Sequence, residues 1–215
     1  MIHREGYKTI LWATFGLVLV YSSCYFLYPK YTFGAISVAC VSTVLWLFVL
    51  QFFRNPSVCV PQQSNVVVAP AHGKVVVIEK VMHQGKEWIQ VSIFMSPFDV
   101  HVNRSPISGV VKKVEYFAGS HRPAWQPKAS LQNERTYIEI QNEHILIAMR
   151  QIAGAMARRI VCYLKQNETV SLGQEIGFIK FGSRVDVLMP TWVDLQVELN
   201  TSVVGGKSVL ATYTT

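Results

Sequence analysis

The sequence predicts a mostly β soluble domain that follows an N-terminal hairpin of two transmembrane helices. Two observations carry this prediction. Hydrophobic residues make up 50% of the 215-residue chain, and the excess is concentrated in two uncharged runs near the N-terminus. After Arg54 the pattern changes to short stretches in which apolar and polar residues alternate, with glycines between them, as in antiparallel strands.

The first element is a membrane anchor, which we expect over residues 1–53. The uncharged runs cover residues 9–28 and 32–53, and each has about the 20 residues that a helix needs to cross a bilayer. A secretory signal would instead have one shorter apolar core and a cleavage site with small residues. Because the link between the runs is so short, both ends of the hairpin should lie on one side of the membrane. A buried helical hairpin in a soluble protein is the alternative.

The distribution of charge predicts which side that is. Arg4 and Lys8 precede the first run and Arg54 follows the second, whereas only Lys30 stands in the link. Because positive flanks favour the cytoplasm, we expect residues 54–215 to face the cytoplasm from the inner cell membrane. The net charge of +7 favours an anionic lipid surface as partner. No basic stripe with interleaved aromatic residues appears, so we expect no nucleic acid.

The four cysteines indicate a reducing compartment. Cys24 and Cys40 lie in the apolar runs, and Cys59 and Cys162 lie beyond them. None has CxxC or metal-ligand spacing, so we expect neither cysteine chemistry nor a bound metal.

Residues 54–215 form the second element, a domain of short strands. Segments such as "SPISGVVKKVEYFAGS" and "NETVSLGQEIGFIK" resemble the strand–turn–strand units of biotinyl- or lipoyl-type domains, so the expected architecture is barrel-sandwich-like. No lysine flanked by methionine is present, which argues against a swinging arm. Residues 153–160 are compatible with one helix or with the entry to a strand. The stretches expected to be strands are NVVVAP, GKVVVIEKV, WIQVSIFM, GVVKKVEYF, RTYIEIQ, HILIAMRQIAG, IVCYL, EIGFIKFG, RVDVLMP and VDLQVEL.

One stretch breaks the strand pattern. Residues 178–190, FIKFGSRVDVLMP, alternate as a strand does, yet Gly182 and Ser183 stand in the middle, where glycine is poorly tolerated. Together with "APAHGKVVVIE", "IQVSIFMSPFDVHVNRSPISG", "AWQPKASLQNERT" and "RQIAGAMARRIVCY", this stretch resembles the short form of the phosphatidylserine decarboxylase proenzymes. The resemblance covers nearly all of residues 55–190.

The resemblance implies a chain that cuts itself between Gly182 and Ser183, giving a large chain of residues 1–182 and a small chain of residues 183–215. Ser183 would become a pyruvoyl group, which forms a Schiff base with the amine of phosphatidylserine and supports its decarboxylation to phosphatidylethanolamine. The family needs no metal. The partners would be phosphatidylserine in the membrane and the two chains of the same proenzyme, with a homo-oligomer left open.

The resemblance also implies roles for two histidines. His101, in "SPFDVHVNR", matches the family histidine that acts beside the pyruvoyl group as proton donor or base. His72, in "APAHGKV", stands where the family has an aspartate that helps to form the self-cleavage site. His72 could itself be the base, or processing could be impaired. Longer family members have a second histidine where this chain has Arg104.

Candidate anion-binding residues are Arg135, Arg158 and Arg159, because a guanidinium pairs well with phosphate or carboxylate. Ordinary ion pairing is the alternative role for each of them. Three other functions stay open. The chain could be a family member impaired in processing, a serine hydrolase that uses Ser183 with Lys180, or a non-enzymatic barrel-sandwich adaptor.

Overall fold

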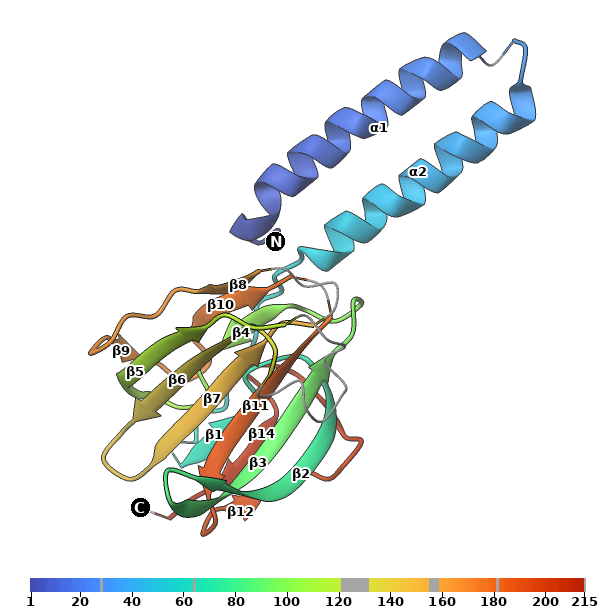
Figure 1. Cartoon of the computed structure of the whole chain (residues 1–215). Coiled ribbons are helices and arrows are strands. Elements are labelled where there is room, and N and C mark those ends of the chain that lie inside the picture. The colour runs from blue at the N-terminus through green and yellow to red at the C-terminus, as the bar shows by residue number, and fades with distance from the viewer. Residues whose placement is uncertain (28, 64, 121–131, 155–158, 181, 215) are drawn as a thin grey trace. The chain divides into compact units, whose positions relative to one another are not determined.

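The computed structural model describes residues 1–27, 29–63, 65–120, 132–154, 159–180 and 182–214 (Figure 1). The chain divides into two compact units, residues 1–57 and residues 58–215.

The first unit is a helical hairpin, which confirms the expected pair of apolar helices. A short 3-10 turn (Arg4–Gly6) leads into α1 (Tyr7–Leu27), and α2 (Thr32–Phe52) returns. Both helices are long and apolar enough to cross a membrane. Within the unit, side-chain hydrogen bonds join the helices, from Trp46 to Thr14 at 2.9 Å and between Tyr21 and Thr43 at 2.6 Å.

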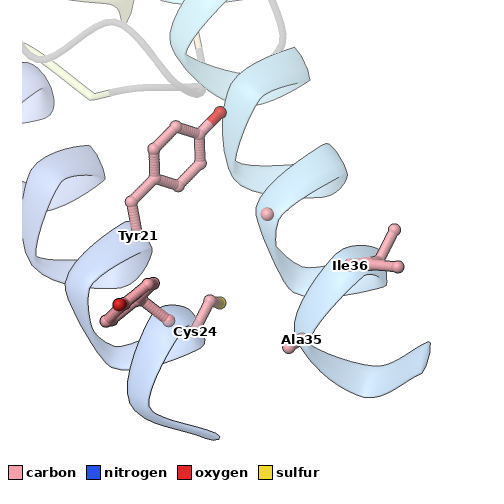
Figure 2. A pocket seen from close by; sticks show the side chains of 6 residues that line it. Tyr21, Cys24, Ala35 and Ile36 are labelled. Atoms are coloured by element: carbon pink, nitrogen blue, oxygen red, sulfur yellow. The ribbon is translucent and has the colours of Figure 1, made fainter. Parts of the chain in front are cut away.

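An apolar hollow of about 470 Å³ lies between the two helices (Figure 2). It is lined by Tyr21, Cys24, Tyr25, Ala35, Ile36 and Ala39. Almost all of its surface is hydrocarbon, as expected for a segment surrounded by lipid.

The second unit is built from strands, as the alternating pattern predicts. Each strand pairs antiparallel with its neighbours. The strands are β1 (Val66–Val68), β2 (Gly73–His83), β3 (Lys86–Met95), β4 (Val102–Arg104), β5 (Gly109–Phe117), β6 (Arg135–Gln141), β7 (Leu146–Ile152), β8 (Ile160–Cys162), β9 (Thr169–Val170), β10 (Glu175–Ile179), β11 (Ser183–Pro190), β12 (Asp194–Leu195), β13 (Ser202–Val203) and β14 (Val209–Thr212).

Three sheets surround one apolar core. The largest has the order β13-β2-β3-β11-β7-β6-β5-β9, and the two smaller sheets are β1-β14-β12 and β4-β10-β8. Alternate residues of the central strands point into the core, among them Ile93, Ile147, Val185 and Val187, and all four are fully buried. This arrangement confirms a mostly β, barrel-sandwich-like domain.

The stretch that breaks the strand pattern joins two sheets. β10 ends at Ile179 in the sheet β4-β10-β8, and β11 begins at Ser183 in the largest sheet. Gly182 therefore lies in the connection, outside both ladders, where glycine costs little. For residues 153–160 the sequence allowed a helix or the entry to a strand. Residues 155–158 lie outside the described residues, and β8 begins at Ile160.

Candidate active site

Ser183 is held at the start of a central strand. β11 pairs with β3 on one side and with β7 on the other, and Ser183 lies opposite Met95. The serine side chain is completely buried, and its Oγ donates to Met95 Sδ at 3.3 Å. A thioether is a weak acceptor and cannot take up a proton at neutral pH. The hydroxyl is therefore dry and oriented, but this neighbour does not activate it.

Gly182 has the backbone conformation that only glycine adopts without strain. Its φ is +55°, in the left-handed region, where an L-residue costs about 1–2 kcal/mol. A Cβ added there would meet no described atom within 4 Å. Backbone conformation, and not lack of space, is thus the reason for glycine before Ser183.

Two buried amides lie on the core side of Ser183, Gln151 from β7 of the same sheet and Asn103 from β4 of a smaller sheet. Asn103 Nδ2 donates to Met95 Sδ at 3.8 Å, and Asn103 Oδ1 accepts from Gln151 Nε2 at 2.8 Å. Both amide side chains are fully buried. Gln151 Oε1 has no hydrogen-bond partner among the described residues. Sequence reasoning missed both, although they lie in the quoted blocks "DVHVNR" and "RQIAG", where a buried polar residue interrupts apolar neighbours.

His101 is completely buried at the entry to β4. Its Nδ1 lies 2.9 Å from the backbone carbonyl oxygen of Asp99, which can only accept, so Nδ1 carries the proton. In the neutral imidazole the lone pair is then on Nε2. The backbone carbonyl of His101 accepts from the N–H of Ile179, four residues before Ser183. In this tautomer, Nε2 of His101 is the atom that can accept a proton.

His72 has the opposite tautomer. It is half-buried and directly precedes β2, and its Nδ1 accepts from the backbone N–H of Gly205 at 3.2 Å. The proton of the neutral ring is therefore on Nε2. β2 and β11 flank β3, and Lys74 of β2 and Arg184 of β11 both pair with Phe94 of β3. Positions 72 and 182, each two residues earlier, therefore lie at the same end of the sheet, two strands apart. Two strand spacings amount to about 10 Å.

Arg104 fills the position of the second family histidine with a different contact. Its Nη1 donates to the carbonyl of Gly173 at 3.1 Å, and burial lowers the pKa of the guanidinium while Glu175 raises it. The side chain also passes close to Gly206. Arg104 therefore links the turns that contain Gly173 and Gly206.

The three candidate arginines fall in different places. Arg159 is exposed, and its carbonyl accepts from the N–H of Lys180, so it lies beside the connection that leads to Ser183. Arg158 lies outside the described residues. Arg135 lies on the opposite face of the largest sheet, with its guanidinium 4.5 Å from the centre of the Phe117 ring.

Arg135 borders a polar cavity of about 220 Å³ on that opposite face. The cavity is lined by His83, Gln84, Lys113, Glu115, Phe117, Arg135, Tyr137 and Arg150. Burial, and the charge of Arg150 after it, lower the pKa of Arg135. This basic cavity and the Ser183 side chain therefore lie on opposite faces of the sheet.

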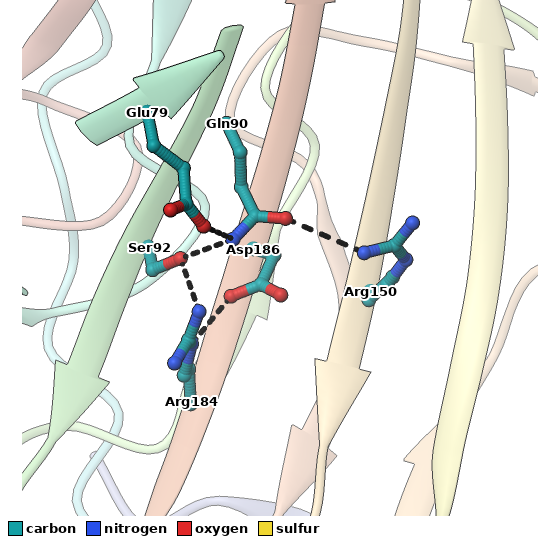
Figure 3. A network of polar contacts seen from close by, with 6 residues as sticks. All are labelled: Glu79, Gln90, Ser92, Arg150, Arg184 and Asp186. Carbon is teal, nitrogen blue, oxygen red and sulfur yellow. Dashed lines mark hydrogen bonds and ion pairs between the residues drawn. The ribbon is translucent and has the colours of Figure 1, made fainter. Parts of the chain in front are cut away.

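A charged network lies on the opposite face of the sheet and includes Arg184 and Asp186, which follow Ser183 in β11 (Figure 3). Arg184 Nε donates to Asp186 Oδ1 at 2.6 Å, and Arg184 Nη2 donates to Ser92 Oγ at 2.7 Å. Gln90 Nε2 donates to Ser92 Oγ at 3.2 Å, and Arg150 Nη1 donates to Gln90 Oε1 at 3.4 Å. Arg184 and Asp186 are almost completely buried. Sequence reasoning left Asp186 unassigned and did not single out Arg184.

Comparison with known proteins identifies the family. A family model described as phosphatidylserine decarboxylase matches residues 45–211. The phosphatidylserine decarboxylase proenzyme of Cytophaga hutchinsonii is 47% identical over 99% of this chain and 98% of its own length. That of Bacteroides fragilis is 44% identical over 98% of this chain and 94% of its own, and that of Cupriavidus pinatubonensis is 40% identical over the same shares. The chain belongs to the phosphatidylserine decarboxylase family.

Membership of the phosphatidylserine decarboxylase family confirms both the resemblance and the enzyme class, a carboxy-lyase. The relatives are named as proenzymes, which implies processing into two chains of one protein. Within the described residues, no group of three or more His, Cys, Asp or Glu side chains is arranged to hold a metal ion.

The surroundings of Ser183 fit a prosthetic group made from that serine. The residue is fully buried at the first position of a central strand, so a group formed there would be dry and anchored by the ladders to β3 and β7. Its described side-chain neighbours on this face, Met95, Asn103 and Gln151, are all uncharged.

Proposed function

We propose that the chain cuts itself between Gly182 and Ser183 and then decarboxylates phosphatidylserine to phosphatidylethanolamine by means of a pyruvoyl group formed from Ser183. One observation carries the proposal. A left-handed glycine directly precedes a buried serine at the connection between two sheets, in a chain that belongs to this family.

The cut starts with attack of Ser183 Oγ on the carbonyl carbon of Gly182. The hydroxyl proton passes to a base, the C–N bond breaks, and the nitrogen takes up a proton, so that an ester replaces the amide. In the elimination that follows, a base removes the Cα proton of residue 183 and the Cβ–O bond breaks, which forms dehydroalanine and releases residues 1–182 with a terminal carboxylate. Addition of water to the resulting dehydroalanine expels ammonia and leaves the ketone at residue 183.

His101 is the base that the geometry favours. Its Nδ1–H is held by the Asp99 carbonyl, which leaves the basic lone pair on Nε2. His72 has its own lone pair directed at the N–H of Gly205, so we assign it no proton transfer. A histidine at position 72 then keeps a backbone contact but does not supply the carboxylate that the family has there.

When formed, the pyruvoyl group supplies an electron sink for loss of the substrate carboxylate. The chain's own residues bind the substrate and move protons around it. Exposed Arg159 and half-buried Lys180 place positive charge at the connection to Ser183, where the lipid phosphate or carboxylate can pair with it. His101, once protonated, returns a proton to the substrate carbon. Phe98, 67% exposed and close to His101 in sequence, offers apolar surface to a lipid.

The two apolar helices support a place in the membrane, and we propose the inner cell membrane with residues 54–215 facing the cytoplasm. Spans buried in lipid do not respond to salt, so the protein should stay with membranes through a high-salt wash. Recovery of the intact chain in the soluble fraction would contradict this location.

Mass spectrometry of Ser183→Ala tests the proposed chemistry. The parent should yield chains of residues 1–182 and 183–215, the smaller with a blocked N-terminus, and the variant should remain one inactive chain. A small chain from Ser183→Ala would refute the self-cleavage. An adaptor would give one chain and be indifferent to the substitution, and a serine hydrolase would be labelled at Ser183 without cutting.

His72→Asp forms a second arm of the same time course. If His72 transfers no proton, this variant should form the small chain at least as fast as the parent. Loss of cutting in His72→Asp would instead make His72 the base.

A further inference from the structure

The side-chain NH₂ of Asn103 is directed toward Met95, the residue opposite Ser183, and has only a weak acceptor there. Gln151 Nε2 donates to Asn103 Oδ1 at 2.8 Å, which fixes the amide orientation and turns its NH₂ toward Met95. The acceptor there is a thioether sulfur 3.8 Å away, a weak partner for a completely buried amide. A strong donor is therefore held in place without a strong acceptor.

The same sulfur connects this donor to the nucleophile. Met95 Sδ accepts from Ser183 Oγ at 3.3 Å, so both donors lie within 4 Å of one atom. Asn103 belongs to β4 and Ser183 to β11, which are in different sheets, and Gly182 lies in the connection between β10, the neighbour of β4, and β11. Asn103 Nδ2 and Ser183 Oγ thus approach the same sulfur from different sheets, next to the peptide bond between residues 182 and 183.

The first step of the cut creates a charge that needs such a donor. When Ser183 Oγ bonds to the Gly182 carbon, the carbonyl electron pair moves to oxygen and forms an oxyanion, while the Oγ proton goes to the base. On this face the described neighbours of Ser183 are neutral, and an amide N–H fixed before the reaction stabilises an oxyanion strongly.

We propose that Asn103 Nδ2–H is the oxyanion donor of the self-cleavage and that Gln151 is the residue that orients it. This assignment rests on the proposed cut at Gly182 and Ser183. Asn103 transfers no proton; it donates a hydrogen bond that is stronger to the oxyanion than to the ground-state carbonyl, so it lowers the barrier.

Asn103→Asp is the most selective test. The aspartate has the same shape and still accepts from Gln151 Nε2, but when ionised it offers no donor and opposes the oxyanion. We expect the rate constant for formation of the small chain to fall by about 10²–10³-fold at neutral pH. Asn142→Asp is the control, because it makes the same change at a side chain whose partners, Ser108, Tyr213 and two backbone N–H groups in the turn before β7, do not belong to this site. It should cut like the parent.

The pH dependence separates a donor from a structural role. Burial raises the pKa of a carboxyl group, so the introduced aspartate should become protonated as the pH falls and then regain an O–H donor. The ratio of the Asn103→Asp rate to the parent rate should therefore rise toward acid pH. A ratio that stays flat, or a variant that cuts as fast as the parent, would overturn the assignment.

Gln151→Leu gives an independent check. It removes the partner that orients the amide, so it should slow the cut, and adding it to Asn103→Leu should cost little more than Asn103→Leu alone. Fully additive losses would contradict a shared role. The assignment and the proposed function fail differently: a parent that never forms the small chain refutes the function, whereas a parent that cuts while Asn103→Asp cuts equally well refutes only the role of Asn103.

Discussion

The two faces of β11 carry different kinds of polar contact. On the core side, Ser183 donates to the Met95 sulfur, the Asn103 amide donates to the same sulfur, and both contacts are weak. On the other side, Arg184 and Asp186 form a buried ion pair, which Ser92 extends. Both sets are almost completely excluded from water. Successive residues of one strand therefore alternate between a neutral face with long contacts to sulfur and a charged face with a short ion pair, although Arg184 Nη1 and Asp186 Oδ2 have no hydrogen-bond partner among the described residues.

The neutral face thus carries the reacting groups, and the charged face holds the strand in position. A nucleophile and an oxyanion donor are most effective when their ground-state partners are weak, because they then gain most in the transition state. The charged side makes strong contacts that span β11 and β3 and hold the strand that begins at Ser183 (Figure 3). If the chain is cut before that strand, its first residues depend on such contacts and on the ladders for their position.

The largest effect should come from breaking the ion pair behind Ser183. In a Ser183→Ala background, which keeps the chain whole, Asp186→Leu would leave the Arg184 charge buried without its carboxylate. We expect the free energy of unfolding to fall by about 3–5 kcal/mol, measured by urea denaturation of the full chain in detergent.

The control for that experiment is the double substitution Arg184→Met with Asp186→Leu. It removes both charges and should recover most of the lost stability, since apolar pairs of similar volume often replace buried ion pairs without loss. If Asp186→Leu alone were as stable as the background, the charged face would not support β11, and the comparison of the two faces would fail.

Sequence reasoning found the elements and the reacting pair but not the environment of that pair. Alternation of apolar and polar residues predicted most strands, because each has one buried face, and the uncharged runs predicted both helices. Family blocks drew attention to Gly182, Ser183 and His101. Asn103, Gln151 and the pairing of Arg184 with Asp186 stayed hidden because each depends on which strands become neighbours, and local spacing does not encode that order.

The apparent continuity of residues 178–190 shows the same limit. Alternation persists across the connection between two sheets, so the pattern alone reads as one strand. The separate partners of β10 and β11, together with the left-handed Gly182, reveal the crossing. The opposite lone pairs of His72 and His101 were equally out of reach, since each depends on a backbone partner.

A smaller effect should follow from replacing the sulfur on the neutral face. Met95→Leu keeps the volume of the core and should cost less than about 1.5 kcal/mol of stability. Because a thioether accepts weakly, we expect the rate of formation of the small chain to change by no more than about threefold. A much larger loss would show that Met95 itself positions the hydroxyl, and that the neutral face is less permissive than its weak contacts suggest.

The smallest effect should appear at His83, the last residue of β2, on the charged side of the sheet. Its Nε2 lies 2.8 Å from the Tyr137 hydroxyl, and that hydroxyl donates to Glu139, so Nε2 donates and the neutral ring titrates at Nδ1. Burial lowers the pKa of His83, as do the charges of Arg150 and then Lys113, while Glu139 raises it.

The sign of the pH effect follows from that lowered pKa. As the pH falls through about 6.5, the unfolded chain binds a proton at His83 more readily than the folded chain does, so the folded state loses stability. The His83 ring is half-buried, and the remaining solvent contact screens the effect and should keep it well under about 1 kcal/mol. In the Ser183→Ala background, His83→Gln should therefore slightly reduce the drop in urea midpoint between neutral and mildly acidic pH. A steeper drop in His83→Gln would mean that the protonated ring is stabilised on this face, and that the carboxylate of Glu139 outweighs the arginine beside it.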